Sequence, residues 1–102
     1  MAYPTSKPPR IDIQAQGTIS SSGKVTTLRA NTAITFSSMV NSLEVSAHVG
    51  DITVKLQIGG AATETNTHLI EEGSSKVFDK MYLTGFTIVE NGVTYSYSGT
   101  YY

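Results

Sequence analysis

The chain has 102 residues, a net charge of −1 and no cysteine, and charged side chains occupy 15% of its positions. This length predicts one domain, and the balanced charge excludes the broad basic surface that binds nucleic acid or an anionic membrane. The lack of cysteine excludes disulfides and cysteine-bound zinc, and no segment is apolar enough for a signal peptide or a membrane-spanning helix. These features fit a protein made in a reducing cytoplasm, or one that is exported without needing cross-links.

The first ten residues contain three prolines, which excludes helix and sheet and predicts an extended arm of polyproline II type. Such a terminus is either frayed or docked on a neighbouring subunit. In the docked interpretation Tyr3 is the anchor, and Lys7 and Arg10 supply the charges. The sequence thus divides into an N-terminal arm, residues 1–10, and a domain, residues 11–102.

The next forty residues predict short strands. Residues 11–16 alternate apolar and polar positions, and residues 18–20 can continue that strand beyond a bulge or turn at Gly17. Glycine, serine and asparagine clusters then separate β-branched runs at residues 25–28 and 33–36. Residues 37–42 fit either a loop or a single helical turn.

A hairpin is predicted over residues 43–58, with Gly50-Asp51 as its turn. A turn at Val49-Gly50 is the alternative, which would place Glu44 across from Lys55. We prefer the first, because glycine suits the first position of a type II′ turn and the resulting register gives four apolar pairs. These pairs are Leu43 with Ile58, Val45 with Leu56, Ala47 with Val54, and Val49 with Ile52.

Residues 59–67 are small and polar, and they predict a loop that is longer than a usual hairpin connection. We take this loop as a candidate contact region, with Gly60 and Thr65 within it. Two short strands follow at residues 68–70 and 76–79, on either side of a turn.

Asn91-Gly92 lies between two alternating runs and predicts a second hairpin, over residues 82–102. Its register places one set of mostly aromatic side chains on the core face: Tyr82, Phe86, Ile88, Tyr95, Tyr97 and Tyr101. These tyrosines either pack in the core or form an aromatic platform for a protein or a sugar. Tyr102, on the opposite face, is a candidate contact residue. Together the short strands predict an all-β fold, either an antiparallel β-sandwich or a jelly-roll-like barrel.

No catalytic, metal or cofactor site is predicted. His48 and His68 are the two histidines, and neither stands in a nucleophile or metal motif. Glu71 and Glu72 are adjacent, which suits a solvated turn better than the paired carboxylates of a glycosidase. We therefore expect a protein that is not an enzyme.

The second half of the chain has a recognisable succession of features: the strand at residues 52–56, the segment Leu69–Asp79, and the Asn91-Gly92 turn with the Tyr-Ser-Tyr-Ser run that follows it. In this pattern residues 51–102 resemble small β-sandwich proteins of tailed bacteriophage particles, of the head-decoration, fibre or tail-accessory type. The resemblance implies a virion structural protein that forms homo-oligomers and binds a capsid or tail protein. A glycan- or cell-surface-binding module is the alternative.

Overall fold

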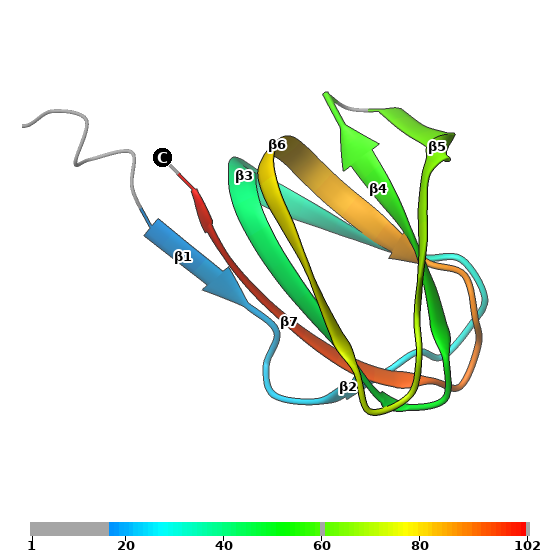
Figure 1. The fold of residues 1–102 in the computed structure, drawn as a ribbon. Coiled ribbons are helices and arrows are strands. Elements are labelled where there is room, and N and C mark those ends of the chain that lie inside the picture. Colours follow the sequence, from blue (N-terminus) through cyan, green and yellow to red (C-terminus); the bar gives the residue numbers. More distant parts are fainter. Residues whose placement is uncertain (1–16, 60, 102) are drawn as a thin grey trace, which may run out of the picture.

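The computed structural model describes residues 17–59 and 61–101, apart from the side chains of residues 61–65 and 80. This part of the chain is all-β and contains no helix, which confirms the predicted fold class. Figure 1 shows its strands: β1 (Gly17–Ser20), β2 (Val25–Thr26), β3 (Thr32–Val49), β4 (Ile52–Ile58), β5 (Ala61–Ile70), β6 (Ser75–Ile88) and β7 (Thr94–Tyr101). The predicted arm and the strand predicted at residues 11–16 lie outside the described residues.

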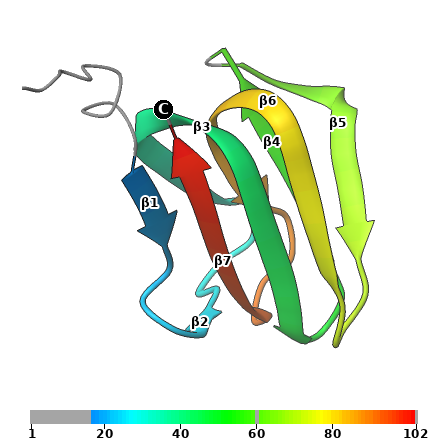
Figure 2. The same ribbon diagram turned by 60° about the vertical axis from the view of Figure 1, so that its left-hand side comes forward.

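The strands form one antiparallel sheet in the order β1-β7-β3-β6-β4-β5, with β2 also paired to β7. The sheet folds over itself into two packed layers, because β3 and β6 are long enough to run through both (Figures 1 and 2). We call them the β7 layer and the β4 layer. The β7 layer contains β1, β2, β7 and the paired halves of β3 and β6 at Ser42–Ser46 and Ser75–Asp79. The β4 layer contains β4, β5 and the other halves of β3 and β6.

The predicted hairpin over residues 43–58 is wrong in its pairing. Both strands exist, but β6 lies between β3 and β4 in the sheet. The Gly50-Asp51 connection therefore passes from one layer to the other. The apolar faces of β3 and β4 meet across the core instead of lying side by side in one sheet. The alternating residues predicted to be buried are therefore still buried: Leu43, Val45, Ala47, Ile52, Val54 and Leu56.

The predicted hairpin over residues 82–102 is wrong for the same reason, because β6 and β7 are separated by β3. Asn91 does not have the positive φ that a type I′ turn requires; of the described non-glycine residues only Asn31 has one. The connection is bound instead by buried Thr27, whose backbone N donates to Val93 O at 2.8 Å and whose Oγ1 donates to Glu90 O at 3.0 Å. Thr27, which is distant in sequence, therefore forms hydrogen bonds with the connection that in a hairpin would form between the two paired strands.

The corner where β3 and β6 change layers is built from register shifts. Thr35 pairs with Gly85 and Val40 pairs with Leu83, so β3 has three more residues than β6 between these pairs. Residues 37–42 are therefore strand with an irregularity, and neither the loop nor the helical turn predicted for them. On β6 the shift reverses the alternation, so that Leu83 is buried and Tyr82 is 69% exposed. The predicted burial of Tyr82 is wrong.

The polar loop predicted at residues 59–67 is also wrong. Gly59, with φ of 62°, begins a tight turn, and β5 starts at Ala61. Lys55 pairs with Thr67 and Gln57 pairs with Ala62, so β5 absorbs its additional residues in a bulge. The small polar residues that suggested a loop thus belong to a strand at the end of the sheet order.

An aromatic cluster joins the two layers. The ring of Phe86, in the β4 layer, lies 5.3 Å from Tyr97 and 6.4 Å from Tyr95 in the β7 layer. Burial, reinforced by Tyr97, raises the pKa of Tyr95. The predicted core positions of Phe86, Ile88 and Tyr95 are confirmed. The core interpretation of these aromatic residues therefore replaces that of an exposed platform.

Candidate interaction face

The outer side of the β7 layer presents short hydroxyl side chains. β1, β3 and β7 each alternate inward apolar residues with outward Ser or Thr, as in Thr94-Tyr95-Ser96-Tyr97-Ser98. We call this surface the hydroxyl face. Its members are Thr18, Ser20, Ser42, Ser46, Ser75, Ser96, Ser98 and Thr100, together with Glu44, Val77 and Asp79.

Strand register arranges the hydroxyl face in rows that cross the sheet. Ser20 pairs with Ser98, Ser98 with Glu44, and Glu44 with Val77. The next row contains Thr18, Thr100, Ser42 and Asp79. With neighbouring strands about 4.8 Å apart, each row is roughly 14 Å long. Four separate parts of the chain thus build one continuous surface.

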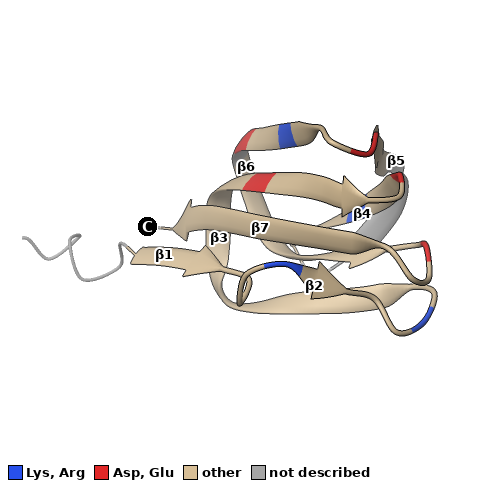
Figure 3. Cartoon of the chain, turned by 90° about the horizontal axis from the view of Figure 1, so that it is seen from below, with Lys and Arg blue, Asp and Glu red and all other residues tan. Residues whose placement is uncertain are grey.

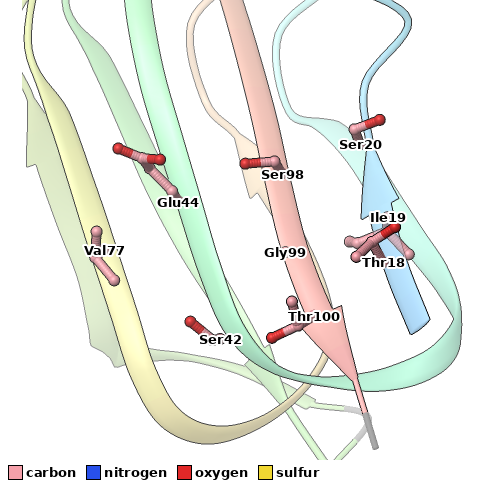
Figure 4. A pocket seen from close by; sticks show the side chains of 9 residues that line it. All are labelled: Thr18, Ile19, Ser20, Ser42, Glu44, Val77, Ser98, Gly99 and Thr100. Carbon is pink, nitrogen blue, oxygen red and sulfur yellow. The ribbon is translucent and has the colours of Figure 1, made fainter. Parts of the chain in front are cut away.

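The middle of this face is hollowed. An open hollow of about 490 Å³ is lined by Thr18, Ile19, Ser20, Ser42, Glu44, Val77, Ser98, Gly99 and Thr100. Figure 4 shows the Ser98 side chain directed towards the strand of Glu44, with Ser42 and Thr100 further along the same two strands. Of the described residues that line the hollow, Glu44 alone carries a charge, and Val77 is 57% exposed.

Charged residues elsewhere in the described part of the chain lie both in the connections and in strands such as β4 and β6, whereas β1 and β7 carry none (Figure 3). At one end of the hydroxyl face the side chains bind each other: Ser46 Oγ lies 2.7 Å from Ser75 Oγ, and His48 Nε2 lies 2.7 Å from Ser96 Oγ. No described side chain forms a hydrogen bond or an ion pair with the Glu44 carboxylate. An exposed carboxylate in a hollow of hydroxyl groups favours a ligand with a positive charge and hydrogen-bond donors.

The six contact residues predicted from the sequence are not brought together by the described structure. Tyr3, Lys7, Arg10, Gly60 and Tyr102 lie outside the described residues. Thr65 lies within β5, and its side chain is outside the described part. The contact role of all six therefore stays a prediction.

The two histidines lie apart from each other in the sheet. His48 stands at the end of β3, and His68 lies in β5 with its ring 4.9 Å from that of Phe78. Partial burial, with a smaller contribution from nearby Lys76, lowers the pKa of His68. Within residues 17–59 and 61–101, no three His, Asp or Glu side chains are grouped where they could hold a metal ion, and no helix could span a membrane.

Sequence reasoning missed the hydroxyl face, although its signal is visible in three places. Thr18-Ile19-Ser20, Ser42–Ser46 and Ser96–Thr100 share the same outward hydroxyl positions. The missing information was that β1, β7, β3 and β6 are neighbours, which depends on contacts distant in sequence. No protein-family model and no curated protein matches this chain.

Proposed function

We propose that the chain is a non-enzymatic structural protein of a bacteriophage particle, which attaches to the capsid or tail lattice or assembles with copies of itself. The sequence resemblance over residues 51–102 supports the assignment of the chain to a bacteriophage particle. The hydroxyl face supports attachment by contact with another protein, and it is the single observation on which the proposal depends.

The hydroxyl face suits burial against another protein. Its side chains are mostly short, so little rotamer freedom is lost when they are covered, in contrast to a surface of Lys and Glu. The hydroxyl groups both donate and accept hydrogen bonds, so they can be satisfied by a partner's backbone. Exposed Val77 adds an apolar contact in the middle.

The alternative, a glycan-binding module, has less support. Sugar sites commonly combine hydrogen-bonding groups with an aromatic ring against which the sugar stacks. Of the described residues that line the hollow, none is aromatic. The exposed Tyr82 is not among them. A glycan array with the purified protein tests this alternative, and specific binding that Glu44→Ala abolishes would favour it.

The proposed function is tested by co-sedimentation of the purified protein with phage particles prepared from the strain that carries the gene. Light scattering gives the mass of the protein alone. We expect binding to particles, self-association, or both, and we expect Ser98→Arg to weaken them because a long side chain would fill the hollow. Leu69→Arg, at a position that is 56% exposed on the outer side of the β4 layer, is the matched control. A strictly monomeric protein that binds no particle would refute the proposal.

A further inference from the structure

We propose that the hollow of the hydroxyl face binds the proline-rich N-terminal segment, residues 4–10, of a second copy of the chain. This inference rests on the proposed function, and it names the partner of the same face. Three observations support it: charge, spacing and the position of β1.

The charges are complementary. Residues 4–10, PTSKPPR, contain the two cations Lys7 and Arg10 and no acidic residue. The hydroxyl face carries Glu44 and Asp79, and the described residues that line its hollow include no basic one. A cationic peptide is therefore the kind of ligand that this surface attracts.

The spacings agree as well. Lys7 and Arg10 are three residues apart, so in the polyproline II conformation that the sequence predicts they would lie on the same side of the segment, one turn or about 9 Å apart. Glu44 pairs with Val77, and Asp79 is two residues further along β6. Such a diagonal pair is separated by about 7–8 Å, so one face of the peptide can reach both carboxylates.

The position of β1 favours a second copy over the same chain. Gly17 begins β1 at the border of the hollow, opposite Tyr101. Six residues, 11–16, separate Arg10 from this end of β1. If they continue β1, as their alternation predicts, they extend about 20 Å beyond Gly17, which would bring residues 4–10 within reach of the hollow of a neighbouring copy.

Val77 completes the proposed site. Its side chain is 57% exposed beside Glu44, and it offers an apolar contact for the proline rings. Main-chain amides and carbonyls of a polyproline II segment are unpaired, so the serine and threonine hydroxyls of the face can bind them.

Cross-linking tests the contact directly, because the chain has no cysteine of its own. Full-length Arg10→Cys is mixed with full-length Glu44→Cys under oxidising conditions, and the products are separated without reducing agent. We expect a disulfide-linked heterodimer. Arg10→Cys mixed with Glu71→Cys, at an exposed turn, is the matched control. Equal yields in the two mixtures, or no heterodimer, would overturn the proposal.

Charge reversal provides a second measurement, the association constant from sedimentation. Lys7→Glu with Arg10→Glu, or Glu44→Lys with Asp79→Lys, should each weaken association at least about tenfold, and combining all four should restore it. Glu71→Lys with Glu72→Lys makes the same net-charge change as the reversed face and should have little effect. An association constant that is unchanged in the charge-reversed variants would overturn this inference. So would a failure of the fourfold variant to recover association. Particle binding that persists in the reversed variants would leave the proposed function standing.

Discussion

The carboxylate of Glu90 accepts two hydrogen bonds from Thr53, one from its backbone N at 2.6 Å and one from its Oγ1 at 2.5 Å. Glu90 lies in the connection between β6 and β7, whereas Thr53 lies in β4. Val89 N also donates to Thr53 O at 3.0 Å. This connection is therefore fastened to the β4 layer on one side, and to Thr27 on the other.

Replacing Glu90 with alanine should lower the free energy of unfolding by about 1–3 kcal/mol, because two charge-assisted hydrogen bonds are lost at a partly buried site. Urea unfolding followed by circular dichroism measures the change. Glu71→Ala, at an exposed turn, should change stability by less than about 0.5 kcal/mol. Equal stabilities of the two variants would show that the Glu90 contacts contribute nothing.

Replacing Gly85 with alanine should lower the free energy of unfolding more than Glu90→Ala does. A Cβ at this position would lie 2.2 Å from the backbone oxygen of Ile34, which can move only if the paired strands separate. We expect a loss of about 3 kcal/mol or more, or failure to fold.

Gly73→Ala separates this clash from the general effect of removing a glycine. Gly73 has a φ of +86° and no atom within 4 Å of a Cβ, so the variant meets backbone strain alone, at about 1–2 kcal/mol. Thermal unfolding ranks the two variants. A smaller loss for Gly85→Ala than for Gly73→Ala would contradict the close approach of β6 to β3.

Thr67→Val should stabilise the protein. The Oγ1 atom of Thr67 is buried and has no hydrogen-bond partner among the described residues, so it contributes only a desolvation cost. Valine keeps the shape, and we expect a gain of about 1 kcal/mol in urea unfolding. Thr94→Val, where Oγ1 is bonded to Thr26 Oγ1 at 2.9 Å on the exposed side, should bring no gain. A destabilised Thr67→Val protein would mean that the hydroxyl is satisfied.

Stability should fall on mild acidification because of His68. Its pKa is lowered in the folded protein, so in the range below about pH 6.5 the unfolded chain binds a proton that the folded protein does not. The contribution is fully present above that pH and is lost as the pH falls towards the folded pKa. Urea midpoints at about pH 7.5 and about pH 5.5 measure the loss. His68→Gln should reduce this loss, and an unchanged pH dependence in His68→Gln would refute the assignment.

Local patterns predicted most strands and much of the core, because alternation depends only on neighbouring residues. Ile52–Ile58 was predicted with its observed bounds, and Phe86 and Tyr95 were predicted as core residues. Strand neighbours were not predicted, because an arch between layers and a hairpin bury the same side chains. Tyr82 was misplaced because a bulge depends on the partner strand. Predicting the hydroxyl face requires knowing which strands are adjacent. Its separate segments can therefore be recognised in the sequence, but the continuous surface cannot.

The place of β7 in the sheet has a consequence for folding during synthesis. β7 pairs with β1, β2 and β3, yet it is the last of the described strands to leave the ribosome. Until then Val45 and Ala47 lack the tyrosines that lie beside them on the core face, Tyr97 and Tyr95, and one edge of β3 is open to other chains. The nascent protein is therefore most vulnerable to aggregation just before synthesis of this strand, and folding must wait for contacts that are distant in sequence.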